Sequence, residues 1–104
     1  MLIEVNTDNH ITGSAELTAE MEATVESALS HFSKQITRVE VHLGDVNGRK
    51  GGDDDIRCMM EARLEGRPPA AVTHQAGTVS DAADGAADKL KAHLESILGR
   101  LSDH

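Results

Sequence analysis

The spacing of apolar residues changes several times along this chain, and that change constrains the fold more than any other feature. Apolar and polar residues alternate in 37–43 and again in 56–65. A period of two is typical of a strand that buries one face. Shorter stretches of the same kind are 2–6 and 70–75, and the pattern of the second does not fix its register. In the two clear strands the apolar face consists of Val39, Val41, Leu43, Cys58, Met60, Ala62 and Leu64.

Two other segments carry apolar residues at helical spacing. The first helix is predicted to begin after Ser14, whose hydroxyl is a suitable N-cap, and the last helix after Thr78 or Ser80. The apolar stripe of the first helix is Leu17, Met21, Val25, Ala28, Leu29 and Phe32. The stripe of the last helix is Ala83, Ala87, Leu90, Leu94, Ile97 and Leu101.

The order of these elements predicts one α+β domain, β-α-β-β-β-α, over residues 1–104. A strand, a helix and a second strand favour a parallel pair joined by a right-handed crossover. The strands that follow are predicted to form an antiparallel meander. Because each strand is apolar on one face only, both helices should cover the same face of a four-stranded sheet. The opposite face should carry mixed charge and contact water.

The single cysteine and the lack of long apolar runs exclude several classes of protein. Cys58 cannot form an internal disulfide, which argues against a secreted disulfide scaffold. No run approaches the ~20 apolar residues of a membrane span, and the first residues do not resemble a signal peptide. We therefore expect a cytoplasmic protein with no membrane partner. Its core should be aliphatic, because Phe32 is the one aromatic residue.

No residue pattern predicts catalysis, a cofactor or a metal. The 6 histidines are not paired at helical spacing, and a lone cysteine provides no zinc ligand set. Residues 45–50 begin like a calcium loop, but Arg49 and Lys50 stand where a ligand and a glycine are required. Cys58 alternates with core residues and is predicted to be a buried, unreactive thiol. We expect neither an enzyme nor a small-molecule substrate.

The formal net charge of −8 is concentrated in the first half of the chain. Residues 1–55 carry 11 acidic and 4 basic side chains, whereas residues 56–104 carry 7 and 6. Nonspecific binding to nucleic acid depends on Lys and Arg side chains that displace counterions. Such binding is therefore not expected of the protein as a whole. A local basic surface on the second half of the chain remains an alternative.

A cationic strip is predicted on the last helix. Lys89, His93 and Arg100 are spaced i, i+4 and i+11 beside the apolar stripe, and Lys91 lies close by. A strip of this kind can contact RNA phosphates. Alternatively, it is a solvated helix face with pairs such as Lys91–Glu95. Three further cations could extend the strip, namely Lys34, Arg49 and Lys50.

The first helix is acidic. Its glutamates are Glu16, Glu20, Glu22 and Glu26. They form two like-charged pairs at i, i+4, which lower the stability of a helix. An acidic face that persists against this cost serves solubility or faces a basic protein.

Two stretches, together with the order of the elements, resemble the ribosome hibernation-promoting factor and ribosome-associated inhibitor family. Residues 82–90 resemble the family's opening of the second helix, and the passage from Phe32 to Leu43 fits its aromatic residue followed by Ile-Thr-x-Val-x-Val. The resemblance covers nearly the whole chain and implies a fold similar to double-stranded-RNA-binding domains. It also implies RNA contacts through basic residues on and around the helices. Lys89 and Lys91 fall on matching positions, while Arg100 and Lys34 match in neighbourhood.

The resemblance implies a stress factor that binds the small ribosomal subunit, through both rRNA and ribosomal proteins, in the channel of mRNA and tRNA. Translation would be regulated by steric exclusion, and the ribosome silenced in hibernation. The alternative is a divergent protein-interaction module outside the ribosome that uses the acidic first helix. A weak homodimer through the edge of the fourth strand is also left open.

Overall fold

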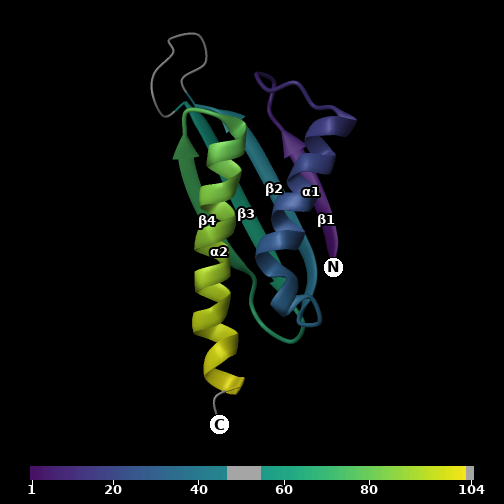
Figure 1. The fold of residues 1–104 in the computed structure, drawn as a ribbon, viewed down its shortest axis with the longest axis vertical. Helices are drawn as coiled ribbons and strands as arrows, with labels where there is room; N and C mark the ends of the chain where they lie inside the picture. Colours follow the sequence, from purple (N-terminus) through teal and green to yellow (C-terminus); the bar gives the residue numbers. More distant parts are fainter. Residues whose placement is uncertain (47–54, 103–104) are drawn as a thin grey trace.

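The computed structural model describes residues 1–46 and 55–102, with side chains up to Leu98. Its elements in chain order are β1 (Leu2–Thr7), α1 (Ala15–Leu29), the 3-10 turn η1 (Ser30–Phe32), β2 (Ile36–Asp45), β3 (Ile56–Leu64), β4 (Ala70–Ala76) and α2 (Val79–Ser102). The fold is therefore α+β in the order β-α-β-β-β-α, as the sequence predicts (Figure 1). Within the described ranges, no helix is long and apolar enough to cross a membrane.

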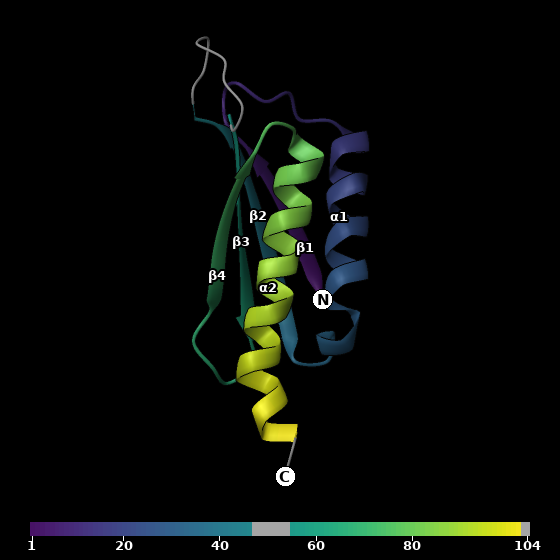
Figure 2. The same cartoon turned by 60° about the vertical axis from the view of Figure 1, so that its left-hand side comes forward.

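The four strands form one mixed sheet in the order β1-β2-β3-β4. β1 is parallel to β2, and the β2–β3 and β3–β4 pairs are antiparallel, which confirms the predicted parallel pair and meander. The register of β4, which the sequence left open, places Val72 opposite Met60. Figures 1 and 2 show both helices on the same face of the sheet, so the opposite face is open.

Hydroxyl side chains begin both helices. Ser14 Oγ accepts a hydrogen bond from the backbone N–H three residues later (3.0 Å), and Thr78 Oγ1 does the same in α2 (3.1 Å). These bonds satisfy donors that the first helical turn leaves without an intrahelical partner. Ser80, the other candidate for the second cap, hydrogen-bonds the carboxylate of Glu20 and so links α2 to α1.

The core lies between the helices and the sheet, and it is aliphatic. The predicted alternation in β2 and β3 is confirmed, because every second residue is buried from Val39 to Leu43 and from Cys58 to Leu64. The helices bury Met21, Val25 and Leu29 from α1 and Ala82, Ala83, Ala86, Ala87, Leu90, Leu94 and Leu98 from α2. Four alanines in the first half of α2 allow its backbone to approach the sheet closely. Leu98 is a core position that the predicted stripe did not contain.

Helix α2 meets β4 at Gly85, where the imidazole of His74 occupies the space of a side chain. A Cβ atom on Gly85 would lie 2.1 Å from Cδ2 and 2.3 Å from Nε2 of His74. Both distances are far inside van der Waals contact, so the ring in this position requires a glycine. A glycine in a helix interior lowers the stability of the helix by about 1 kcal/mol relative to alanine. The close contact with His74 explains why a glycine stands at position 85.

The hairpin of β2 and β3 continues further than the sequence predicts. β2 extends to Asp45, and beyond it the N–H of Val46 donates to the carbonyl oxygen of Asp55 (2.8 Å). The predicted loop over 45–55 therefore begins later than expected. Most of that loop, including most of the calcium-like segment 45–50, lies outside the described residues.

Candidate nucleic-acid interface

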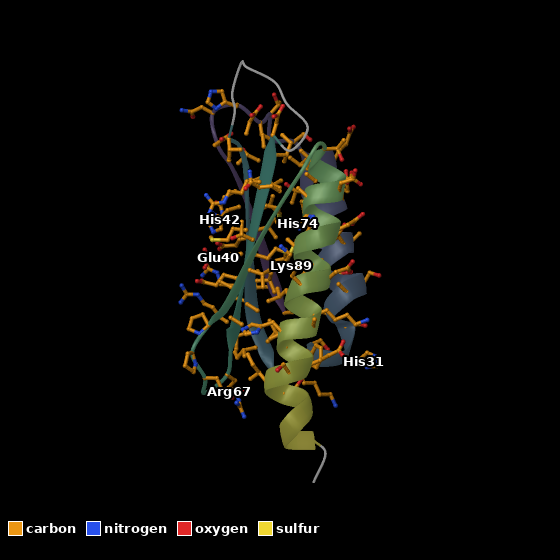
Figure 3. All side chains as sticks on the ribbon, turned by 90° about the vertical axis from the view of Figure 1, so that its left-hand side faces the viewer. His31, Glu40, His42, Arg67, His74 and Lys89 are labelled. Carbon is orange, nitrogen blue, oxygen red and sulfur yellow. The ribbon has the colours of Figure 1, made fainter. Side chains whose placement is uncertain are left out.

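The two lysines of the predicted cationic strip lie on opposite flanks of α2. Lys89 Nζ donates to the backbone carbonyl oxygen of Thr73 in β4 (2.9 Å), while Lys91 lines the groove between α1 and α2. Two positions along an α-helix are about 200° apart around its axis, which explains the divergence. Figure 3 shows Lys89 where α2 crosses β4. The structure therefore does not bring Lys89 and Lys91 together on one surface.

The other predicted cations are distributed along the chain. His93 lies one helical turn beyond Lys89 and is exposed. Lys34 is exposed in the segment between η1 and β2, and Figure 1 shows this segment at the end of the molecule toward which both helices run. Arg100 belongs to α2, but its side chain is outside the described set. Arg49 and Lys50 lie in the segment that the structure does not describe.

The groove between α1 and α2 is acidic. It measures about 590 Å³, and the side chains of Asp84 and Asp88 line it together with Lys91. The α1 wall consists of small residues, Ala23, Thr24, Ser27 and Ala28. The sequences of the two helices carry eight acidic and three basic residues, histidine aside. Lys91 is therefore a local cation in a negatively charged surrounding.

Charged side chains on the open face of the sheet form a linked network. At its centre is Glu40, whose side chain is 17% exposed and lies 3.3 Å from Arg63 Nε and 3.7 Å from Arg38 Nε. Arg38 also pairs with Glu4, and Arg63 Nε lies 3.5 Å from Glu61. The strand register places the three glutamates in a row across β1, β2 and β3. This network confirms the predicted face of mixed charge.

Arg57 and Arg67 are exposed cations that the sequence analysis did not include in the site. Arg57 lies near the start of β3, and Arg67 lies in the turn between β3 and β4, at the opposite end of the sheet. Neither side chain has a hydrogen bond or ion pair with another described residue. The polar face of β3, on which Arg57 alternates with buried residues, was the signal that could have identified it.

Asp8 ties the segment after β1 to the end of β2. Its Oδ1 accepts hydrogen bonds from the N–H groups of His10 (2.9 Å) and Ile11 (3.2 Å), and its Oδ2 accepts one from the N–H of Asp45 (3.0 Å). The bond from His10, followed by the other backbone donors, holds the pKa of Asp8 below its ordinary value of 3.8. The carboxylate is therefore ionised at neutral pH.

Cys58 lies in the core, and burial raises the pKa of its thiol to about 12. The thiol is protonated at neutral pH and is a poor nucleophile, in agreement with the prediction. Among the side chains that the structure describes, no three His, Cys, Asp or Glu residues are grouped as metal ligands.

The architecture matches solved structures over nearly the whole chain. The N-terminal domain of Thermus thermophilus Protein Y has a TM-score of 0.74 at 14% identity, covering 93% of this chain and 99% of that one. A ribosomal subunit interface protein from Coxiella burnetii has a TM-score of 0.71 at 13% identity, covering 95% and 99%. At these identities the similarity establishes the fold.

Membership of a family comes from the sequence itself. No curated protein matches the chain. The family model described as sigma 54 modulation protein / S30EA ribosomal protein matches residues 9–102. The matched region contains every helix and strand except β1. In agreement with the resemblance seen in the sequence, the chain belongs to this ribosome-associated family of sigma 54 modulation and S30EA ribosomal proteins.

Proposed function

We propose that this chain binds the small ribosomal subunit and blocks translation by occupying space that mRNA and tRNA require. The observation that carries the proposal is the family match over residues 9–102. The fold supports it, because one solved structure with this fold is named a ribosomal subunit interface protein. A protein with this role acts in the cytoplasm, as a hibernation factor that silences ribosomes under stress.

The proposed action is steric and requires no bond to be made or broken. The molecule is elongated, with extents of 50 × 25 × 21 Å, and its helices and sheet pack into one continuous core. A packed body of this shape can fill a channel that an extended nucleic acid would otherwise use. Neither a cofactor nor a small-molecule substrate has a part in this action.

The proposed contact with rRNA is local, because the net charge of −8 opposes binding to RNA through the whole surface. The cations that we assign to it are Lys34, Lys89, Lys91, His93 and Arg100, together with Arg49 and Lys50. The segment between η1 and β2, which contains Lys34, and the second half of α2 support this assignment, since both segments lie toward the same end of the molecule (Figure 1). Phosphate contacts made by these side chains would position the domain on rRNA without reading its sequence.

The test compares two variants that each neutralise three charges. The first is Lys34→Gln, Lys91→Gln and Arg100→Gln, which spares Lys89 because that side chain also bonds to β4. The matched control is Glu16→Gln, Glu22→Gln and Glu26→Gln on the exposed or half-exposed side of α1. Both proteins are measured for binding to purified small subunits and for inhibition of translation in a cell-free extract.

We expect the cation variant to bind at least about tenfold more weakly at physiological salt, and to inhibit translation correspondingly less. The acid variant should bind as well as the unchanged protein or better, because it removes repulsion from phosphate. Equal binding by all three proteins would contradict the assigned contact. Failure of the unchanged protein to bind would contradict the proposal itself.

A second candidate function is an interaction with a basic protein outside the ribosome. It is favoured by the glutamates of α1, all of which are at least partly exposed, and by Asp84 and Asp88 in the adjacent groove. The same pair of variants separates the two functions. If the acidic face binds a protein, the acid variant should lose its partner and the cation variant should keep it.

A further inference from the structure

A shallow notch lies on the open face of the sheet, at the end where β2 finishes and β3 begins. Its volume is about 370 Å³. Gly44 of β2 is paired in register with Arg57 of β3, and His42 is paired with Met59. Because Gly44 has no side chain, the surface of the sheet is lower between these larger neighbours, and the carboxylate of Asp8 approaches the position of the missing side chain. The notch is thus built by regular strand pairing, from four residues of the two central strands.

Arg57 is the cation of this notch. The other two arginines on the open face, Arg38 and Arg63, are held by the glutamate network. The guanidinium of Arg57 makes no hydrogen bond or ion pair to any other described residue. It therefore keeps its planar face and its donors for a ligand. Arginine side chains commonly stack on nucleobases and donate to their acceptor edges.

Asp8 and His42 add polar groups of a different kind. Asp8 Oδ2 accepts one backbone hydrogen bond and lies 3.0 Å from the position that a Cβ of Gly44 would occupy. The same oxygen lies 3.7 Å from His10 Nδ1, and as part of an exposed carboxylate beside Gly44 it retains a lone pair for a ligand. His42 Nε2 lies 3.6 Å from Glu40 Oε1, which is too long for a hydrogen bond. Figure 3 shows His42 on the face of the sheet away from α2.

Apolar side chains complete the notch. Met59 is half-buried beside His42, and Val46, with 48% of its surface exposed, stands at the rim, while Leu43 borders the notch with its backbone because its side chain is buried in the core. A ligand that fits must be flat enough for a shallow site and apolar on its faces. It must also carry hydrogen-bond donors and acceptors at its edges. A simple phosphate fits poorly, because the ionised carboxylate of Asp8 would repel it.

We propose that the notch over Gly44 binds an unpaired nucleobase of RNA. In this arrangement Met59 and the guanidinium of Arg57 contact the base, and the carboxylate of Asp8 accepts from a ring or exocyclic N–H. Guanine is the base with the best fit, since it offers acceptors to an arginine on one edge and donors to a carboxylate on the other. The identity of the ligand as RNA rests on the proposed function, and the notch extends the RNA contact from the helices to the open face of the sheet.

The test uses two single-stranded RNA octamers and the full chain. One octamer is uridine with a single central guanosine, and the other carries an abasic nucleotide at that position. Both have the same phosphates, so a contact through the backbone alone cannot distinguish them. We expect the guanosine octamer to bind roughly tenfold more tightly, in the range that base stacking and hydrogen bonding supply. Equal binding of the two octamers would overturn the proposal.

Three variants locate the preference for guanosine on the protein. Arg57→Gln and Arg67→Gln remove the same charge from exposed side chains at opposite ends of β3. Arg57→Gln should abolish the preference for guanosine over the abasic octamer, and Arg67→Gln should keep it. Gly44→Ala places a methyl group 3.0 Å from Asp8 Oδ2, which crowds both the notch and this carboxylate without a change of charge, and should also reduce the preference. Loss of the preference in Arg67→Gln to the same extent as in Arg57→Gln would place the effect elsewhere and contradict the proposal.

Ribosome binding is measured separately, by sedimentation of the same proteins with small subunits. A chain that sediments with subunits but does not distinguish the octamers retains the proposed function and lacks the base site. A chain that distinguishes the octamers and never sediments with subunits has the base site without the proposed function.

Discussion

The amine of Lys89 donates a hydrogen bond to the carbonyl oxygen of Thr73, 2.9 Å away, and this contact joins α2 to β4. β4 is an outer strand of the sheet, so one of its sides has no partner among the strands that the structure describes. An open edge can pair with a second chain, and a lysine placed at it opposes such pairing. Lys89 therefore has a structural role besides its proposed contact with RNA.

Replacement of Lys89 should weaken the fold more than replacement of Lys91. Lys89→Gln is expected to lower the free energy of unfolding by about 0.5–1.5 kcal/mol, the value of one hydrogen bond. Lys91→Gln should change it by less than about 0.5 kcal/mol, as is usual on a surface. Urea denaturation of the two variants provides the comparison.

The same variants test the weak homodimer. If Lys89 protects the edge of β4, then Lys89→Gln should associate more strongly than Lys91→Gln in sedimentation equilibrium. If both variants have the same free energy of unfolding and the same tendency to associate, the contact between Lys89 and Thr73 neither stabilises the fold nor protects the edge of β4.

His74 and Gly85 should be energetically coupled. In the unchanged protein, Gly85→Ala gains about 1 kcal/mol of helix propensity but forces the imidazole of His74 away from a Cβ at 2.1 Å. In the His74→Ala background the same substitution keeps the gain without the clash. In a double-mutant cycle by thermal denaturation, the double variant should therefore be more stable than the sum of the two single effects predicts, by about 1–3 kcal/mol. A coupling near zero would mean that the ring moves aside freely.

The thiol of Cys58 should react only when the protein unfolds. Burial raises its pKa from 9.0 to about 12, so the thiolate is scarce in the folded state at pH 9. Iodoacetamide should modify the urea-unfolded chain rapidly and the native chain slowly, as followed by mass spectrometry. Similar rates in both states would contradict the burial of this residue.

The same shift predicts a loss of stability in alkali. The folded-state pKa of Cys58 is raised, so its contribution is complete below pH 9.0 and is lost as pH rises toward about 12. The unfolded chain then releases a proton that the folded chain keeps. A Cys58→Ala variant should lack this part of the alkaline decline in melting temperature.

Asp8 should stabilise the fold in its ionised form. The backbone donors lower its pKa below 3.8, so its contribution is present above that pH and is lost as pH falls through the folded-state value. The melting temperatures of the unchanged protein and Asp8→Asn should therefore differ most near neutral pH. The difference should narrow below pH 3.8. A difference that does not change with pH would exclude a role for the charge.

The sequence predicts β2 and β3 well because a period of two determines which side chains meet the helices. Each residue from Val39 to Leu43 and from Cys58 to Leu64 lies on the face that the alternation indicates. The register of β4 could not be predicted in this way. It depends on pairing with β3 and on the packing of His74 against Gly85, and neither is visible within a short alanine-rich strand.

The candidate site was harder to predict than the fold. Lys89 and Lys91 are neighbours in sequence, yet the helix sends them to opposite flanks, and the partner of Lys89 lies 16 residues away in β4. The helical spacing of cations does not indicate Arg57, because this residue belongs to the polar face of a strand. Arg57 is available for a ligand because Glu40 forms ion pairs with Arg38 and Arg63 instead. Only the tertiary structure shows which arginines form these ion pairs.

The central claim is that this protein binds ribosomes through the small subunit, and co-sedimentation tests it most directly. Purified protein is mixed with ribosomes and with separated subunits, and run on sucrose gradients at low and at physiological salt. We predict that it migrates with the small subunit and with intact ribosomes, and that binding weakens as salt rises because phosphate contacts contribute to it. Absence from every ribosomal fraction, even at low salt, would contradict the account.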